Sequence, residues 1–117
     1  MQFTVLAAII PDAQEESVIE IAKKAGAGSV TILHGKNIGL KEKKVFFGLT
    51  LEENVSVLLF ILPKKISITI FKTLKKELKL DEKENKNGII LTFALSHLAG
   101  MEDEEIELFE EEIINDL

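Results

Sequence analysis

The chain has 117 residues, 46% of them hydrophobic, so it can bury one core and is too apolar for a disordered protein. It contains no cysteine, which excludes disulfides, a cysteine nucleophile and cysteine-ligated metal sites. The net charge of −6 is unevenly distributed, because residues 102–117 carry nine acids and no lysine. Residues 1–101 hold 14 lysines against 11 acids. This small excess of positive charge is lower than that of a typical nucleic-acid binder.

An apolar run, an amphipathic segment and a second apolar run come first along the chain. Residues 2–10 form a nearly continuous apolar run closed by Pro11, which predicts a strand buried on both faces. Asp12 and Glu15 have the spacing of a capping box, and a helix is predicted from about 13 to 25, with Gly26 ending it. Residues 29–34 predict a second strand.

A long polar loop separates the second strand from the next apolar segments. Residues 35–44 contain two glycines and four lysines, which is typical of an exposed loop. The segments 45–51 and 55–62 both read as strands. The turn at 52–54 between them predicts that they pair as a hairpin.

The segment 64–79 fits two patterns. Ile66, Ile68 and Ile70 alternate as in a strand, whereas Ile66, Ile70, Leu74 and Leu78 recur every four residues as in a helix. We favour the helix. Asn87-Gly88 then predicts a turn, and residues 89–95 a fourth strand.

The acidic C-terminal segment also has an apolar pattern. Within residues 102–117, the side chains of Ile106, Phe109, Ile113 and Leu117 fall on one face at helical spacing. The segment therefore predicts an amphipathic helix that packs on another surface.

The predicted elements follow the order β-α-β-β-α-β. This is an α+β, ferredoxin-like sandwich with a long loop after the second strand and an acidic C-terminal helix. The expected organisation is one domain over residues 1–101 with an extension over residues 102–117. The ferredoxin-like fold hosts many functions, so it does not decide this one.

Several short motifs occur in the order and spacing of one protein family. They are Ala7-Ala8-Ile9-Ile10-Pro11, Gly28-Ser29-Val30-Thr31, Gly35 at the start of the loop, Asn87-Gly88-Ile89-Ile90 and Ser96-His97-Leu98-Ala99-Gly100. Over about residues 3–101 the chain resembles the nitrogen-regulatory PII signal-transduction proteins, and more closely their divergent PII-like relatives.

The resemblance implies a cytoplasmic homotrimer that regulates a target and is not an enzyme. An adenine nucleotide would bind at the clefts between subunits, and the long loop would contact a protein such as a membrane transporter or an enzyme, with no nucleic acid involved. The loop lysines implied for this contact are Lys41, Lys43 and Lys44. The residues implied for nucleotide binding are Ala8, Gly28, Ser29, Gly35, Lys36, Asn37, Lys86, Asn87, Gly88 and His97.

The chain departs from the classical family pattern at three points. It has no tyrosine, so the loop cannot be uridylylated, and its only glutamines are Gln2 and Gln14, so the loop glutamine linked to 2-oxoglutarate is missing. The classical family has two arginines after the fourth strand. Here that region reads His97-Leu98-Ala99-Gly100 and contains neither arginine nor lysine. These departures disfavour a triphosphate and 2-oxoglutarate and favour a smaller or less charged adenine nucleotide, such as AMP or cyclic AMP.

The same residues have plainer interpretations. The stretch from Gly35 to Gly39 could form an anion-binding nest of backbone N–H groups or simply a flexible loop, and the loop lysines could contact a partner or only water. His34 and His97 are the only imidazoles, and no metal site is predicted from them.

Two other functions remain open. The first is a structural or interaction trimer that has lost ligand binding. The second is a divalent-metal binder like the related copper-tolerance trimers, which the absence of cysteine and the scarcity of histidine disfavour. The chain also lacks an apolar run of membrane-spanning length and the pattern of a signal peptide, which fits the expected cytoplasmic location.

Overall fold

The computed structural model describes residues 2–38, 45–46, 49–50, 53–82 and 88–101. Six strands and two α-helices lie in these residues, with a short 3₁₀ turn η1 (Asp12–Gln14) leading into the first helix. In chain order they are β1 (Phe3–Pro11), α1 (Glu15–Lys24), β2 (Thr31–Asn37), β3 (Val45–Phe46), β4 (Leu49–Thr50), β5 (Glu53–Pro63), α2 (Lys64–Glu77) and β6 (Ile89–Ala94).

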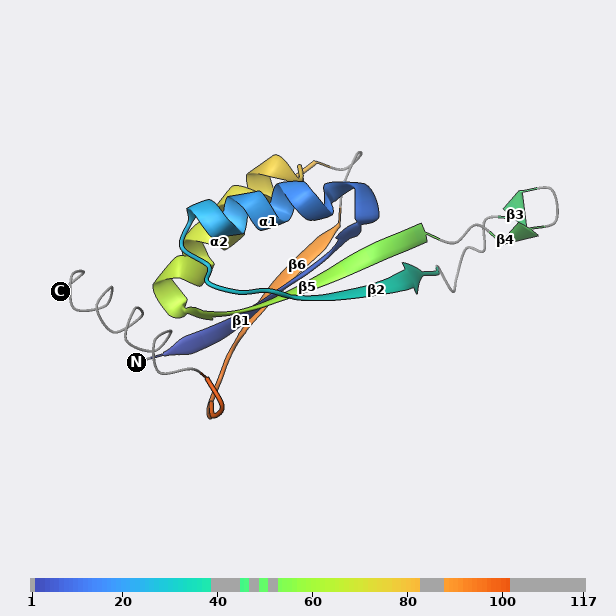
Figure 1. The fold of residues 1–117 in the computed structure, drawn as a ribbon. Helices are drawn as coiled ribbons and strands as arrows, with labels where there is room; N and C mark the ends of the chain where they lie inside the picture. Colours follow the sequence, from blue (N-terminus) through green and yellow to red (C-terminus); the bar gives the residue numbers. More distant parts are fainter. Residues whose placement is uncertain (1, 39–44, 47–48, 51–52, 83–87, 102–117) are drawn as a thin grey trace.

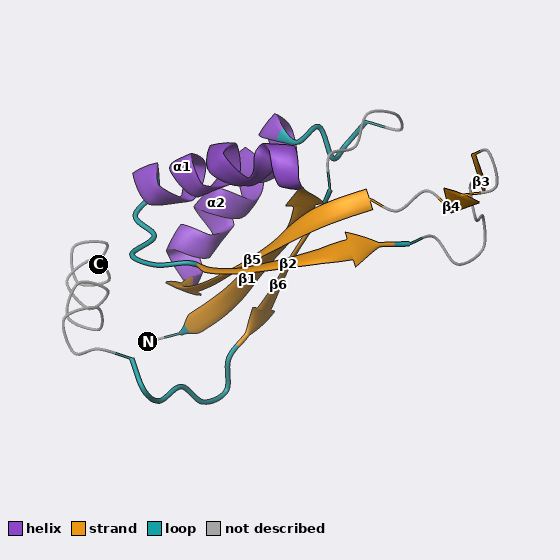
Figure 2. Cartoon of the chain, turned by 45° about the vertical axis from the view of Figure 1, so that its right-hand side comes forward, coloured by secondary structure: helices purple, strands orange, loops and turns teal. Residues whose placement is uncertain are grey.

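Four strands form one antiparallel sheet in the order β2-β5-β1-β6. Both helices lie on the same face of this sheet, and they run in opposite directions (Figures 1 and 2). This arrangement confirms the predicted ferredoxin-like α+β fold. β3 and β4 form a separate two-stranded ribbon.

The core lies between the sheet and the two helices. Along β1 and β5, alternate residues face the helices, so that Leu6 lies opposite Phe60 and Ala8 opposite Leu58. α2 contributes a stripe at the predicted four-residue spacing, and burial of this stripe decides the ambiguous segment in favour of a helix. The apolar residues of the core that are fully buried or nearly so are Leu6, Ala8, Ile10, Val18, Ala22, Leu58, Phe60, Leu62, Ile66, Ile70, Leu74 and Leu78.

The sequence predicted the C-terminal end of α1 correctly but not the capping of its N-terminal end. Gly26 ends the helix as expected: its φ is 110°, and Ala27 N–H donates to the Ala22 carbonyl at 2.9 Å, as in a Schellman cap. The predicted capping box is wrong, because no side chain caps α1 or η1. Asp12 instead accepts a hydrogen bond from the buried Ser56 hydroxyl at 2.8 Å.

The predicted hairpin between 45–51 and 55–62 is also wrong. β5 pairs with β2 on one side and β1 on the other, with Gly35 opposite Val55 and Asn37 opposite Glu53. The long loop therefore connects the two paired strands β2 and β5, and the β3–β4 ribbon lies within this connection (Figure 1). A buried central strand needs two hydrogen-bonded neighbours, and β2 supplies one over seven residue pairs, whereas β3 and β4 pair over two.

No helix among the described residues lies on the second face of the sheet (Figure 1). We call it the open face; it is lined with apolar side chains, which are Val5, Ala7, Ile9, Leu33, Val57, Leu59, Ile61, Ile89, Leu91 and Phe93. Several of them are well exposed, including Ile89 at 60%, Leu33 at 52% and Phe93 at 51%. None of the helices in the described part of the chain has the length and hydropathy needed to cross a bilayer.

Candidate functional site

The root of the long loop lies at one end of the edge strand β2. Gly35, Lys36 and Asn37 are the last residues of this strand and are exposed. Their backbone groups pair with β5 on one side only, since β2 is an edge of the sheet. Among the described residues, no atom lies within 4 Å of a Cβ built on Gly35, so these residues leave the space beside it open.

Gly88 lies at the opposite edge of the sheet, directly before β6. Its φ is 134°, and a Cβ there would come within 2.4 Å of the Ile9 carbonyl oxygen and 3.0 Å of an Ile10 methyl group. A side chain is therefore excluded on both conformational and steric grounds. This close approach explains why glycine occupies position 88.

Gly88 and the loop root lie at the same end of the sheet but on different edges. Gly88 packs beside Ile10, which is paired with Ser56, and Ser56 is paired with His34 next to Gly35. Three strand spacings of about 4.8 Å each therefore separate the two edges. Within one copy of the chain, β5 and β1 therefore lie between the two groups.

The other predicted nucleotide residues lie elsewhere. Gly28 and Ser29 precede β2, and His97 follows β6, so all three lie toward the end of the sheet that is opposite to the loop root. His97 is exposed. Ala8 lies in the core with no exposed surface, between β5 and β6 neighbours, so we leave it out of the candidate site.

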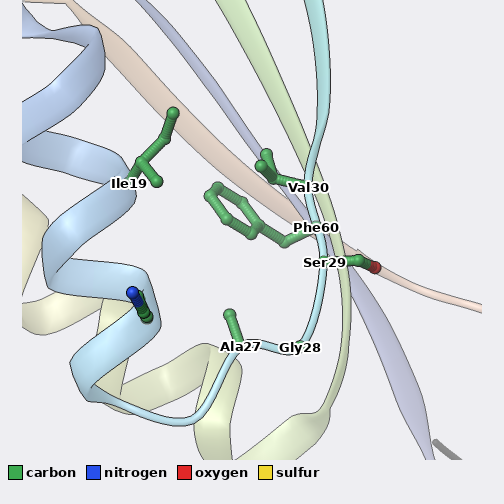
Figure 3. A pocket seen from close by; sticks show the side chains of 7 residues that line it. Ile19, Ala27, Gly28, Ser29, Val30 and Phe60 are labelled. Atoms are coloured by element: carbon green, nitrogen blue, oxygen red, sulfur yellow. The ribbon is translucent and has the colours of Figure 1, made fainter.

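A small cavity lies between α1, the link to β2 and the centre of β5. Its volume is about 220 Å³, and it is lined by Ile19, Lys23, Ala27, Gly28, Ser29, Val30 and Phe60. Figure 3 shows the side chains of Val30 and Phe60 between the sheet and α1, while the Ser29 hydroxyl points to the other side of β2. The cavity is therefore mostly apolar, and the Ser29 hydroxyl points away from it (Figure 3).

Two polar contacts beside the loop root were missed by the sequence reasoning. His34 Nε2 lies 2.7 Å from Glu15 Oε1, and the Ser56 hydroxyl donates to the Asp12 carboxylate in η1 at 2.8 Å. These contacts tie β2 and β5 to the start of α1, directly before Gly35. No sequence signal could have found them, because Glu15 and His34 meet only through the β2–β5 register.

The remaining predicted site residues lie outside the described residues. These are Lys86 and Asn87 before β6, and Lys41, Lys43 and Lys44 between β2 and β3. Among the residues that are described, no group of three or more histidine, aspartate or glutamate side chains could hold a metal ion.

Replacing Gly88 with alanine should destabilise the fold by about 2–4 kcal/mol, because the strained φ and the contact with the Ile9 carbonyl act together. Urea unfolding followed by circular dichroism measures this change. Gly35→Ala is the matched control: nothing lies near its Cβ, so the change should stay within about 1 kcal/mol. Equal losses in both variants would contradict the described packing of Gly88.

Comparison with known proteins supports the fold. Neither a protein-family model nor a curated protein sequence matches the chain. One similar solved structure is CPII from Thiomonas intermedia K12, which is described as a nitrogen regulatory PII-like protein bound to ADP, AMP and bicarbonate. It superposes with a TM-score of 0.64 at 11% identity, over 86% of this chain and 98% of that one.

GlnK from B. subtilis is a second structure with this fold. It gives a TM-score of 0.62 at 17% identity over 82% of this chain and 87% of that one. Its complex with ATP gives 0.61 at 18% identity, over 81% and 85%. The resemblance seen in the sequence is thus confirmed at the level of the fold, which is that of PII and PII-like proteins.

Proposed function

We propose that the protein is a PII-type regulatory protein that binds an adenine nucleotide between copies of its chain and signals through its long loop. The observation that carries this proposal is the position of the loop root and Gly88 on opposite free edges at one end of the sheet. Two copies placed edge to edge would bring these groups together at a cleft. The glycines would let backbone N–H groups approach an anionic ligand closely.

The open face supports assembly of the chain with itself. Ten apolar side chains from four strands line one continuous surface, and Leu33, Leu91 and Phe93 on it are between 38% and 52% exposed. Exposed apolar surfaces of this extent are typical of interfaces. A trimer, the assembly implied by the resemblance, would bury the open faces toward a shared axis and leave the helices outside.

The nucleotide bound by relatives of this fold supports the ligand class. CPII is described with ADP and AMP, and GlnK with ATP. In this chain, residues 88–101 contain no lysine and no arginine, so little positive charge is available beside β6 to balance a triphosphate. We therefore propose AMP, cyclic AMP or ADP as the preferred ligand.

The long loop supports a regulatory role. Its root is held by the β2–β5 ladder and by the His34–Glu15 contact, so a ligand at Gly35 would lie next to the residues that set the direction of the loop. Binding there would change the positions that the loop can occupy. The target, a transporter or an enzyme, would contact the loop through Lys41, Lys43 and Lys44.

Calorimetric titration of the purified protein tests the proposal. AMP, ADP, cyclic AMP and ATP are each titrated with and without magnesium, and we expect micromolar binding to at least one. Gly35→Val should abolish it, because the valine fills the open space at the loop root, whereas Ser17→Val on the exposed surface of α1 should leave it unchanged. In both variants, circular dichroism should report an intact fold.

The absence of binding in a folded, oligomeric wild-type protein would refute nucleotide sensing. It would favour the second function, a structural trimer without a ligand, which the lack of basic residues beside β6 makes the natural alternative. A shift in oligomeric state caused by Gly35→Val would instead show that the residue belongs to an interface.

A further inference from the structure

We propose that the outward face of α2 is the docking surface for the chain's own acidic C-terminal segment, residues 102–117. This surface, the α2 lysine face, consists of Lys65, Ile68, Lys72 and Lys76. They follow one another at spacings of three or four residues, so they form one stripe along the helix. The proposal is independent of nucleotide binding.

The α2 lysine face lies opposite to the buried stripe of the same helix. Ile66, Ile70 and Leu74 pack into the core, while all four members of the lysine face are exposed. No acidic residue occurs in α2 before Glu77. Lys75 lies beside this face, with its ammonium nitrogen 3.3 Å from the Asp81 carboxylate.

Ile68 gives this basic surface an apolar centre. The side chain is 43% exposed, and Lys65 and Lys72 lie three residues before it and four residues after it. An apolar group surrounded by ammonium groups favours a partner that carries both apolar side chains and carboxylates. A purely charged peptide would leave Ile68 uncovered.

The C-terminal segment has this composition. It carries nine acidic residues and no lysine, and Ile106, Phe109 and Ile113 fall on one face at helical spacing. As a helix, its 16 residues would extend about 24 Å, close to the roughly 21 Å of the 14-residue α2. Charge, apolar pattern and length therefore all match the α2 lysine face.

The path of the chain leads to this surface. Leu95 N–H donates to the Phe3 carbonyl at 2.9 Å, and Lys64 N–H donates to the Gln2 carbonyl at 3.1 Å. The end of β6 and the first residue of α2 therefore flank the same two residues at the start of β1, at one end of the sheet (Figure 1). The seven residues 95–101 can span more than 20 Å when extended.

The open face is the competing surface, and it fits the segment less well. All ten side chains that define it are apolar, so it offers no cation to the nine carboxylates. Placing carboxylates over that surface would remove them from water without a partner. The charge distribution thus directs the acidic segment to α2.

A spin label at the C-terminal segment tests the proposal in the full-length protein. Because the chain has no cysteine, Asn115→Cys provides a single attachment site for a nitroxide. At 20 mM NaCl we expect strong paramagnetic broadening of the α2 amide signals around Lys72 and weaker broadening around Leu91 on β6, the strand behind this helix. At 500 mM NaCl the broadening should decrease several-fold, because salt screens the attraction.

Charge reversal on two helices provides the matched comparison. Lys72→Glu with Lys76→Glu should abolish the broadening at low salt. Lys23→Glu with Lys24→Glu changes the net charge by the same amount on α1 and should preserve it. Equal loss in both variants would show a net-charge effect and overturn the proposal.

Three further results would overturn it. The first is broadening centred on the open face, and the second is no broadening at either salt concentration. The third comes from mixing spin-labelled, unenriched chains with ¹⁵N-enriched, unlabelled ones: broadening of α2 that arises only between different chains would place the segment on a neighbouring subunit instead of its own helix.

Discussion

Phe60→Ala is expected to lower the free energy of unfolding by about 3–5 kcal/mol, the range for truncating a buried phenylalanine. Phe60 is the largest of the buried side chains in the part of the chain that the structure describes; it is only 1% exposed and lies opposite Leu6 in the middle of the sheet. The substitution removes apolar contacts with α1 and enlarges the cavity beside Ile19 and Val30. Urea unfolding at fixed protein concentration measures the loss.

Phe71→Ala is the control for this prediction. Phe71 lies at the margin of the core on α2 and is only partly buried, so its truncation should cost clearly less. Equal losses for Phe60 and Phe71 would contradict the central position of Phe60. Fixed protein concentration matters because assembly adds to the apparent stability.

Placing charges on the open face should prevent assembly of the chain. In the variant Leu33→Glu with Phe93→Glu, two carboxylates replace apolar side chains on opposite edge strands. Burying them in an interface would leave unpaired charges without water, a cost that a typical interface cannot offset. We expect sedimentation velocity to show an oligomer, by our proposal a trimer, for the wild type and a monomer for the variant.

Ile68→Glu is the control for the open face. Ile68 is an exposed apolar residue of comparable size on the outer helix, so its replacement should leave the oligomer intact. A wild-type monomer would contradict assembly through the open face. So would an oligomer that survives the paired substitution.

Local sequence patterns predicted the elements that depend on neighbours along the chain. The stripe Ile66, Ile70, Leu74 and Leu78 indicated α2 although the first residues also alternate like a strand, and Gly26 marked the end of α1. Both features arise from contacts within one or two turns of helix. The strands 3–11 and 89–94 were likewise visible as apolar runs bounded by Pro11 and Gly88.

Contacts between distant segments could not be predicted in the same way. The turn-like residues 52–54 suggested the wrong hairpin, because the pairing partner of β5 is decided by the ladder with β2, beyond a long loop. Asp12 had the spacing of a helix cap, but the buried Ser56 hydroxyl competes for its carboxylate once β5 lies beside η1. Both errors reflect tertiary contacts that outweigh a local preference.

The candidate site was predicted only in part for the same reason. Gly35, Lys36 and Asn37 lie at the loop root as expected, and the backbone geometry of Gly88 explains its identity. Ala8 belonged to a motif that the resemblance associated with the ligand, yet its side chain faces the core. Strand alternation alone could not assign Ala8 to a face, because apolar residues occupy both faces of β1.

The central claim is that the nucleotide site uses the loop root of one copy and the turn before β6 of another. Variants that damage one partner each can test this claim when they are mixed. Gly35→Val alters the loop root, and Lys86→Glu reverses a charge in the turn. Each variant alone should fail to bind the preferred nucleotide.

The decisive measurement is therefore nucleotide binding by oligomers reassembled from an equal mixture of the Gly35→Val and Lys86→Glu chains. A cleft formed by the intact loop root of one chain and the intact turn of its neighbour should bind with wild-type affinity, so the mixture should recover a fraction of the sites that neither variant has alone. Verified mixing without any recovery would contradict a site shared between copies, because each chain would then carry its own complete, damaged site.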